Sequence, residues 1–397
     1  MKWMEKAIGM FCDTGSGGTP SRDRAAEFYG GSIPWVKSGE LRESVILSAS
    51  ETITEAGLAN SSAKLVPAGA LLVAMYGATV GRVGILGIEA ATNQAICHIV
   101  PRNGAADVRY LFHALQSKLP EFLSRSVGGA QPNISQEIIR GTTIPLPPIE
   151  EQRRIAAILG KADALRQKRR IALQKLDSLT QSIFLDMFGD PVANNFSFPM
   201  VSVSSFVSQF GTGKSIAPNE DEHADSPFRV LKVSAVTSNE YLPEESKPIP
   251  EGYLPPESHF VKSGDLLFSR ANTSDLIGAT AYVATAEKNR LLPDKIWRFI
   301  WRDAAKVEPL FVWFLFRQPS IRRAIAQLAT GTSGSMKNIS QGKVLGIRLG
   351  LPPLAKQKRF AGAVSVWMQS REKMYRSKTM LDDNFASLQH RAFRGEL

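Results

Sequence analysis

The longest regular pattern of apolar and polar residues in this chain begins just after a run of prolines. From Glu150 to about Phe188 the sequence contains no proline and is rich in Ala, Leu, Gln, Arg and Lys, which lose little rotamer freedom in a helix. Asp190 and Pro191 follow Gly189 and form a stop signal. The pattern predicts one uninterrupted helix of about 38 residues, which is roughly 57 Å long at a rise of about 1.5 Å per residue.

Apolar residues recur along this predicted helix at heptad spacing. Two series share the spacing, namely Ile155, Ala162, Leu176 and Ile183, and Ile158, Leu165, Ala172 and Leu179. The stripe is narrow and the remaining positions are charged, which is typical of a helix packed against one partner helix. An ordinary amphipathic helix lying on its own domain is the alternative.

The partner helix is indicated by an internal repeat. A shift of 205 residues superimposes, without a gap, Asn133-Ile134-Ser135-Gln136 on Asn338-Ile339-Ser340-Gln341, Leu146-Pro147-Pro148 on Leu351-Pro352-Pro353, and Gln152 on Gln357. The second helix has large side chains on one heptad position and smaller ones on the other, namely Phe360, Trp367, Met374, Leu381 and Leu388, and Ala363, Ser370, Ser377 and Asn384. Large side chains of one helix can therefore pack against small ones of the other.

The residues before each long helix share one predicted layout. In the first half a Gly-rich loop precedes four strand candidates and a helical pattern, at 15–20, 33–37, 71–75, 83–86, 95–100 and 108–123. Corresponding segments of the second half are 211–214, 228–234, 263–270 and 310–329. The two halves share this layout but little residue-level detail.

We therefore predict an α+β fold with a pseudo-two-fold internal repeat. It consists of a globular domain of mixed α/β layout at 1–144, a spacer helix at 145–191, a second globular domain at 192–348 and a second spacer helix at 349–397. An approximate two-fold axis perpendicular to the helix pair would make the two helices an antiparallel coiled coil.

Composition and charge narrow the class of protein. The 397 residues are 43% hydrophobic and 21% charged, as in soluble globular proteins, and 48 basic residues against 37 acidic ones give a net charge of +11. This excess is compatible with a polyanionic partner such as nucleic acid. Cys12 and Cys97 have no metal or disulfide spacing, and no signal peptide or membrane span is apparent. We expect a cytoplasmic protein without membrane attachment.

Catalytic motifs are missing from the sequence. Gly213-Lys214-Ser215 resembles the end of a phosphate-binding loop, but Ser208 stands where that loop needs its first glycine. Leu146 before Pro147-Pro148 cannot supply the polar group that amino-methylating enzymes use to hold a target amine. The five histidines are scattered without metal-ligand spacing. We expect neither an enzyme nor a cofactor-binding protein.

The chain resembles the specificity subunit of a Type I restriction-modification system, over essentially its whole length. The residues that carry this resemblance are the segment 146–155 with the helix after it, its weaker second copy at 351–360, Gly17-Gly18-Thr19-Pro20, Gly77-Ala78-Thr79-Val80-Gly81 and Asn93-Gln94. The second half departs from the pattern, because Lys295 stands in the place of Gln94 and Arg270 in the place of Met75. Such divergence would suit two domains that read different sequences.

The resemblance implies a non-catalytic subunit whose two target-recognition domains each read one half of a bipartite site on double-stranded DNA. It also implies that the paired helices set the gap between the half-sites and bind two methyltransferase subunits, which flip and methylate adenines. Restriction motor-nuclease subunits would join this assembly. The cofactors S-adenosylmethionine, ATP and Mg²⁺ would belong to these partners, and none to this chain.

DNA readers place Lys and Arg at phosphates, and Arg, Asn, Gln, Ser or Thr at base edges. The candidate DNA contacts in the first half are the loop residues Ser21, Arg22, Lys37, Ser38, Tyr76, Thr79 and Arg82, with Gln131 at the junction to the helix. Those in the second half are Lys214, Ser215, Lys232, Arg270, Asn272, Thr273 and Ser274, with Lys337 at the junction. For each residue a solvated loop or turn position is the alternative.

Two other functions are compatible with the same pattern. A stand-alone sequence-specific DNA-binding regulator with a coiled-coil brace would bind tightly without a methyltransferase. A structural coiled-coil adaptor would show no salt-dependent DNA binding, since only phosphate contacts release counterions.

Overall fold

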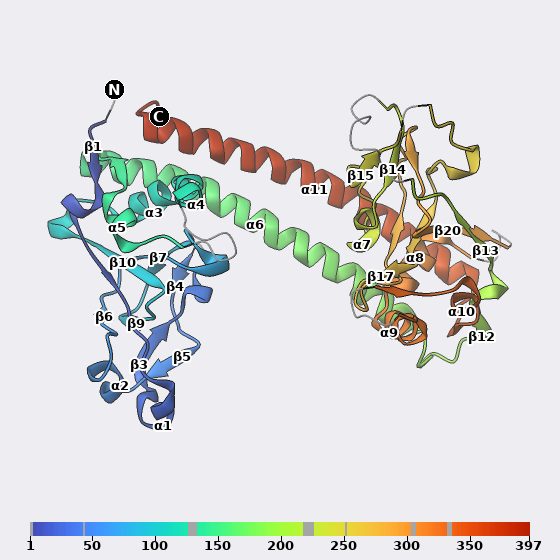
Figure 1. Cartoon of the computed structure of the whole chain (residues 1–397), viewed down its shortest axis with the longest axis horizontal. Helices are drawn as coiled ribbons and strands as arrows, with labels where there is room; N and C mark the ends of the chain where they lie inside the picture. The colour runs from blue at the N-terminus through green and yellow to red at the C-terminus, as the bar shows by residue number, and fades with distance from the viewer. Residues whose placement is uncertain are drawn as a thin grey trace. The chain divides into compact units, whose positions relative to one another are not determined.

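A computed structural model describes residues 3–42, 44–125, 133–216, 226–250, 252–302, 307–331 and 336–397. Contacts divide the chain into two units, of which unit 1 comprises Met1–Ile171 with Tyr375–Leu397 and unit 2 comprises Ala172–Met374. Each unit contains one globular head and a part of both long helices, α6 (Ile149–Phe188) and α11 (Leu354–Arg394) (Figure 1). The finer four-part division proposed from the sequence stays a prediction.

The head of unit 1 contains two β-sheets. The first has the order β2-β10-β7-β8-β4, with bounds Cys12–Ser16, Ile96–Pro101, Leu71–Ala74, Val83–Leu86 and Val45–Ile46. The second has the order β5-β3-β9-β6, with bounds Glu51–Ile53, Tyr29–Val36, Ala90–Thr92 and Leu65–Val66. All four residues of β7 are buried, which agrees with the continuous apolar run that predicted this strand.

The described residues of the head of unit 2 repeat this strand order without counterparts of the edge strands β4 and β6. Its first sheet is β13-β20-β16-β18, with bounds Val207–Thr212, Ile296–Trp301, Leu266–Ser269 and Thr280–Tyr282. Its second sheet is β15-β14-β19, with bounds Ser246–Pro248, Arg229–Leu231 and Arg290–Leu291. Within the second sheets β14 and β19 are parallel, as are β3 and β9. The two heads therefore share one topology, which the predicted strand positions had indicated.

Short elements complete both heads. A two-stranded sheet joins the start of each head to its end, β1 with β11 (Glu5–Ala7, Thr143–Pro145) and β12 with β22 (Met200–Ser202, Arg348–Gly350). The two-stranded sheet β17-β21 (Ala271–Asn272, Lys337–Asn338) occurs in unit 2. The short helices are α1 (Ala25–Phe28), α2 (Glu55–Ala59), α5 (Gln136–Gly141), α7 (Ser234–Thr237) and α10 (Gln341–Leu345). Ser135 caps α5 as predicted, because its Oγ accepts from Ile138 N at 3.2 Å.

Two helices stand in each head where the apolar pattern indicated one helical stretch. These pairs are α3 and α4 (Val108–Ser117, Leu119–Arg125), and α8 and α9 (Pro309–Arg317, Pro319–Leu328). The break lies at Lys118 in unit 1 and at Gln318 in unit 2. Pro120 and Pro319 stand in the first turn of the second helix, where the missing N–H costs no hydrogen bond.

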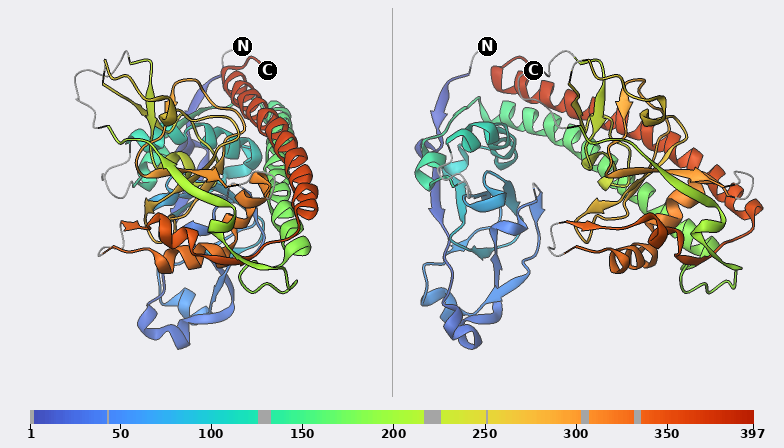
Figure 2. Two further views of the ribbon diagram at one scale, coloured as in Figure 1. Left: turned by 90° about the vertical axis from the view of Figure 1, so that its right-hand side faces the viewer. Right: turned by 45° about the vertical axis from the view of Figure 1, so that its right-hand side comes forward.

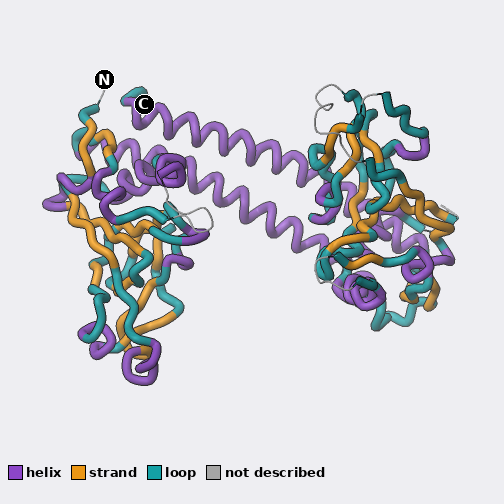
Figure 3. Tube along the Cα trace, viewed as in Figure 1, coloured by secondary structure: helices purple, strands orange, loops and turns teal. Residues whose placement is uncertain are grey.

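The two long helices run antiparallel in both units (Figure 3). In unit 1 Arg166 Nε donates to Asp382 Oδ1 at 2.7 Å, and Arg154 Nη2 donates to the Leu397 carbonyl at 2.8 Å. In unit 2 Arg371 Nε donates to Asp177 Oδ1 at 2.9 Å, and the Phe184 and Phe360 rings are 5.4 Å apart. The predicted antiparallel helix pair is therefore confirmed.

The prediction that the second heptad series of α6 packs against the partner helix is wrong at Leu165 and Leu179. Leu165 and Leu179 are 54% and 55% exposed, whereas Thr180 is buried and Arg166 and Asp177 bond to α11. A helix with 3.6 residues per turn drifts by about 20° per heptad relative to a 3.5-residue repeat. The packed stripe therefore moves off the heptad positions, and polar residues occupy part of it.

A buried glutamine fastens each head to its long helix by the same hydrogen bonds. Gln152 Oε1 accepts from Asp107 N at 2.9 Å, and its Nε2 donates to the Pro147 carbonyl at 2.8 Å. Gln357 repeats this in unit 2, since its Oε1 accepts from Glu308 N at 3.0 Å and its Nε2 donates to a proline carbonyl at 2.8 Å. The glutamines are 1% and 0% exposed. Gln152 and Gln357, which the 205-residue shift superimposes in the sequence, thus hold equivalent positions in the two units.

The hydrophobic cores at the two joints differ in composition. In unit 2 the core joining head and helices is largely aromatic and includes Phe184, Phe188, Phe311, Phe314, Phe360 and Trp367. In unit 1 the corresponding core contains more aliphatic residues and adjoins the buried His113, whose ring lies 6.1 Å from that of Phe385.

The sheets and helices of each head can be followed in the further views of Figure 2. Among the described residues, no helix is both long and apolar enough to cross a membrane.

Candidate nucleic-acid interface

In unit 1 two predicted DNA contacts meet at one acidic side chain. Glu51 in β5 accepts from Arg22 Nη2 at 2.7 Å and from Lys37 Nζ at 2.6 Å. Strand pairing explains this arrangement, because Glu51 lies opposite Trp35 in β3, and Lys37 directly follows the end of this strand, two residues after Trp35. The structure thus brings together cations that are 15 positions apart in the sequence.

Stacking further restrains Arg22. Its guanidinium carbon lies 4.0 Å from the centre of the Tyr29 ring, and that ring meets Trp35 edge to face at 5.7 Å. The hydrogen bonds from Lys37 and Arg22 hold the pKa of the Glu51 carboxyl below its usual value. Glu51 therefore stays ionised and keeps both cations in place. We refer to Arg22, Lys37 and Glu51 as the Glu51 cluster.

The Gly-rich loop of unit 1 packs beside this cluster. Gly18 N donates to the Thr92 carbonyl at 2.9 Å, and Trp35 Nε1 donates to the Gly18 carbonyl at 3.0 Å. A Cβ at Gly17 would collide with the Thr92 carbonyl, which explains why this position requires glycine. The Thr19 hydroxyl donates to Gln94 Oε1. Two of the loop segments that carry the sequence resemblance, Gly17–Pro20 and Asn93-Gln94, are therefore in contact through Thr19 and Gln94.

The other predicted contacts of unit 1 are separate from the Glu51 cluster or help to form turns. Ser21 Oγ accepts from Asp23 N at 3.3 Å and caps a short turn, and Ser38 begins another turn. Thr79 Oγ1 donates to the Tyr76 carbonyl at 3.4 Å in the loop after β7, where Arg82 is exposed. Gln131 lies outside the described residues.

Unit 2 also joins two predicted contacts through one acidic residue. Arg270 Nε donates to the Asp294 carbonyl at 2.8 Å, and its Nη2 lies 3.4 Å from Asp294 Oδ2. The Ser215 hydroxyl donates to Asp294 Oδ1. These three residues, which we call the Asp294 cluster, come from the loops at one end of the adjacent strands β13, β20 and β16.

Three of the remaining candidates of unit 2, Asn272, Thr273 and Lys337, lie at a second short strand pairing. Asn272 in β17 pairs with Lys337 in β21, and Lys337 Nζ donates to the Gly331 carbonyl at 3.2 Å. Thr273 N donates to Asn272 Oδ1 at 2.9 Å, which shapes the turn after β17. Three candidates are exposed, namely Lys214, Lys232 and Ser274. No contact above tests whether any of these residues touches DNA, so the assignments stay predictions.

Glu51 and Asp294 are the site residues that sequence reasoning missed. An acidic residue is a poor candidate for binding a polyanion, so only cationic and neutral polar residues were considered. The signal for Asp294 was its place directly before Lys295, which aligns with Gln94. Glu51 had no comparable signal, because its cations become neighbours only through the β3–β5 pairing.

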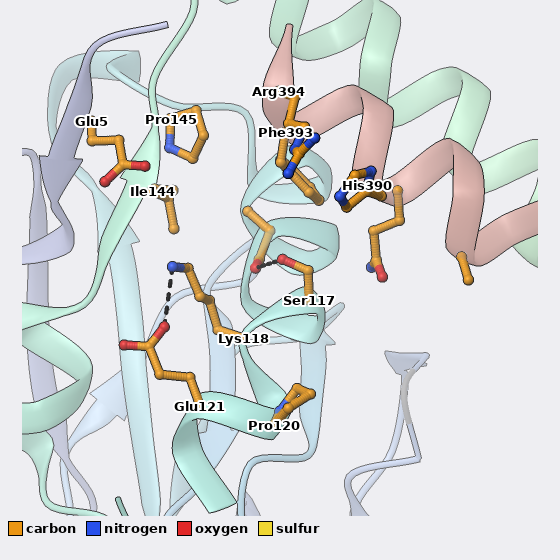
Figure 4. A pocket seen from close by; sticks show the side chains of 13 residues that line it. Glu5, Ser117, Lys118, Pro120, Glu121, Ile144, Pro145, His390, Phe393 and Arg394 are labelled. Atoms are coloured by element: carbon orange, nitrogen blue, oxygen red, sulfur yellow. Dashed lines mark hydrogen bonds and ion pairs between the residues drawn. The ribbon is translucent and has the colours of Figure 1, made fainter. Parts of the chain in front are cut away.

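A pocket of about 480 Å³ lies elsewhere in unit 1 (Figure 4). Residues from α3, α4, β11 and the end of α11 line it, among them Lys118, Glu121, His390 and Phe393, and the first two form an ion pair at 3.1 Å. None of the predicted DNA contacts that the structure describes lines this pocket. Within the described ranges no cluster of three or more His, Cys, Asp or Glu residues could hold a metal ion.

Sequence comparison connects the chain with known proteins. Residues 1–175 match the family described as the Type I restriction modification DNA specificity domain. The specificity subunits of the Type I restriction enzymes EcoR124I/EcoR124II of Escherichia coli and MjaIX of Methanocaldococcus jannaschii are 29% and 30% identical over 40% and 47% of this chain. These two alignments span 41% and 44% of the relatives' own lengths. The MjaVIII specificity subunit is 24% identical over 73% of this chain and 70% of its own.

Two solved structures share the fold over nearly the whole chain. The S subunit of a Type I restriction-modification system from M. genitalium matches with a TM-score of 0.59 at 13% identity, covering 98% of this chain and 96% of that one. A chain from a study of complex assembly and conformational transition of the Type I R-M system matches with a TM-score of 0.55 at 18% identity, covering 100% and 98%. Residues 1–175 thus match the Type I restriction modification DNA specificity domain family, and the resemblance of the chain to Type I specificity subunits is confirmed.

Proposed function

We propose that this protein is the non-catalytic DNA-specificity subunit of a Type I restriction-modification complex, and that each head reads one half of a bipartite DNA site. The observation that carries this proposal is the repeat of one head topology with two different polar clusters. A repeated scaffold with unlike contact residues suits a protein that reads two unlike half-sites. The specificity-domain match of residues 1–175 supports the same function.

The two long helices are proposed to set the gap between half-sites and to bind two adenine-methyltransferase subunits. Each helix continues through both units, and large apolar side chains remain exposed along them, including Leu165, Leu179, Val366 and Met380. Exposed apolar residues of this kind are common at protein interfaces. Motor-nuclease subunits would join the assembly in the cytoplasm, and S-adenosylmethionine, ATP and Mg²⁺ would be bound by the partners.

Electrostatics supports DNA as the ligand. The chain carries a net charge of +11, and its predicted DNA contacts include the exposed cations Arg82 of unit 1 and Lys214 and Lys232 of unit 2. Each phosphate that a cation neutralises releases counterions, so binding by the assembled complex should weaken steeply as salt increases. A complex whose DNA affinity does not change with salt would contradict the proposal.

The decisive experiment is methylation-aware sequencing of DNA from cells that contain this chain and its methyltransferase. Replacing residues 192–348 by the corresponding head of another specificity subunit should change one half of the methylated motif only. Replacing residues 1–144 is the matched control and should change the other half. An unchanged motif after either replacement would refute the assignment of one head to one half-site. Tight footprinting by the chain alone would favour the stand-alone regulator.

The helices are tested separately. Inserting a few helix-forming residues near Gln174 of α6, with a matching insertion in α11, should change the number of unread bases between the half-sites. The half-site sequences should stay the same, because the heads are untouched. A stable insertion variant with an unaltered gap would show that the helices do not set the spacing.

A further inference from the structure

Three loops meet at one end of the first sheet of unit 2. The C-terminal ends of β13 and β16 both pair with the start of β20, because Thr212 and Phe268 are each opposite Trp297. Ser215 follows the first of these strands, Arg270 directly follows the second, and Asp294 precedes β20. Sheet geometry therefore brings the three residues of the Asp294 cluster together.

Asp294 uses only part of the hydrogen-bonding capacity of Arg270. A guanidinium has five N–H donors in a planar fork. Nε and one Nη2 donor face the Asp294 carbonyl and carboxylate, which leaves the two donors of Nη1 and one of Nη2 on the opposite edge. The described residues supply no acceptor for these three donors, and the Arg270 side chain is 29% exposed. The free edge of the fork can therefore bind a ligand end-on.

The orientation of the fork is set before any ligand arrives. Arg270 also lies 5.9 Å from the ring centre of Trp297, and Trp297 stacks against Phe210 and Phe268 at 5.1 and 5.8 Å. Backbone bonds fix the segment on both sides, since Arg270 N donates to the Lys295 carbonyl at 3.1 Å and Ile339 N donates to the Arg270 carbonyl at 3.1 Å. A side chain held in this way loses little freedom on binding.

The carboxylate behind the fork disfavours a phosphate as its ligand. Asp294 offsets the charge of Arg270 and would repel a phosphate placed beside it. A base edge carries partial charges only, so the carboxylate does not exclude it. The planar, two-donor edge matches guanine, which presents O6 and N7 as paired acceptors in the major groove.

We propose that Arg270 reads a guanine in the half-site bound by the second head, and that Asp294 is the positioning residue that holds the Arg270 guanidinium in the required orientation. This inference rests on the proposed function. At the equivalent position of unit 1 there is no such fork, because the buried Met75 stands in the place of Arg270. The guanine contact therefore belongs to the second half-site alone.

The test uses the full chain with its methyltransferase and reads the methylated motif by sequencing. Arg270→Ala should relax one guanine position of the second half-site, lowering the preference for guanine there by roughly ten-fold or more. Arg270→Lys keeps the charge but removes the two-donor edge, so it should relax the same position. Asp294→Asn should relax that position to a smaller extent. The first half-site should stay unchanged in all three variants.

Lys262→Ala is the matched control, because Lys262 is an exposed cation of the same head and pairs only with the exposed Glu257 among the described residues. It should leave the whole motif unchanged. An unaltered motif in Arg270→Ala or in Arg270→Lys would overturn the inference, as would an equal loss of methylation at all sites without relaxation of one base. A wild-type complex that methylates with no preference in a second half-site would instead refute the proposed function.

Discussion

The two heads have the same strand order but different polar chemistry. In unit 1 Glu51 joins Arg22 and Lys37 at the second sheet, whereas in unit 2 Asp294 joins Ser215 and Arg270 at the end of the first sheet. The joints to the long helices show the opposite behaviour, because Gln152 and Gln357 repeat the same hydrogen bonds. The comparison separates residues that build the scaffold from residues that would read a ligand.

The largest expected effect concerns the two buried glutamines. Gln152→Leu and Gln357→Leu should each lower the free energy of unfolding by about 3 kcal/mol, because each leaves a partly buried main-chain amide and a buried carbonyl without their glutamine partner. Chemical denaturation of the full chain, followed by circular dichroism, measures this loss. Gln174→Leu, at an exposed position of α6, is the control and should have little effect. A large loss for one glutamine only would show that the two joints are not equivalent.

The reciprocal ion pairs between the long helices should have smaller and unequal effects. Arg371→Met removes ion pairs to Asp177 on α6 and to Glu240 in the head. Among the described residues, the contacts that Arg166→Met removes are to the long helices, namely ion pairs to Asp163 and Asp382 and a cation–π contact to Phe385 at 4.3 Å. We expect a loss of about 1 kcal/mol for Arg166→Met and a larger one for Arg371→Met. Denaturation midpoints of the two variants provide the comparison. Equal losses would mean that the Glu240 contact adds no stability.

A buried histidine should make unit 1 the more acid-sensitive unit. Burial lowers the pKa of His113 below its ordinary value of 6.5, with Asp163 and Gln116 opposing the shift. The stability that depends on neutral His113 is thus complete above about pH 6.5 and is lost as the pH falls through the lowered pKa. His113→Phe, which introduces the residue type found at Phe314 of unit 2, should flatten this loss in thermal unfolding between pH 7 and about 5. An unchanged pH profile would exclude His113 as its source.

The smallest expected effect on stability is that of Glu51→Gln, because this carboxylate lies near the surface. The depressed pKa of Glu51 means that its contribution is present at neutral pH and is lost as the pH falls through that lowered value. The variant should therefore slightly weaken the dependence of stability on acid pH. It should alter only the first half of the methylated motif. A change in the second half would contradict the independence of the two heads.

The sequence predicted the elements that depend on local pattern or on the repeat. The helix over 150–188 was predicted almost to the residue, because prolines and a glycine bound it. The breaks at Lys118 and Gln318 were missed, since the apolar pattern continues across both. The exposure of Leu165 and Leu179 was missed because the pattern of one helix does not reveal where the stripe of its partner lies.

The candidate site was less predictable than the fold. Arg22, Lys37, Ser215 and Arg270 were selected by residue type and loop position alone. Their grouping depends on Glu51 and Asp294, which become neighbours of these residues only through strand pairing over long sequence separations. A single sequence contains no periodic pattern that reveals contacts between residues so far apart along the chain.

The hydrogen bonds of the two buried glutamines have a consequence for the evolution of the sequence. Among the described residues Gln152 and Gln357 bond to main-chain atoms, namely the amides of residues 107 and 308 and the carbonyls of residues 147 and 352, and Gln152 also bonds to the Ala105 carbonyl at 3.5 Å. Every amino acid except proline has both a main-chain N–H and a main-chain carbonyl, so these bonds place little restriction on residue type in the head that they anchor. Either head can therefore change in sequence, or be replaced through recombination, while the same glutamine still bonds to its main chain.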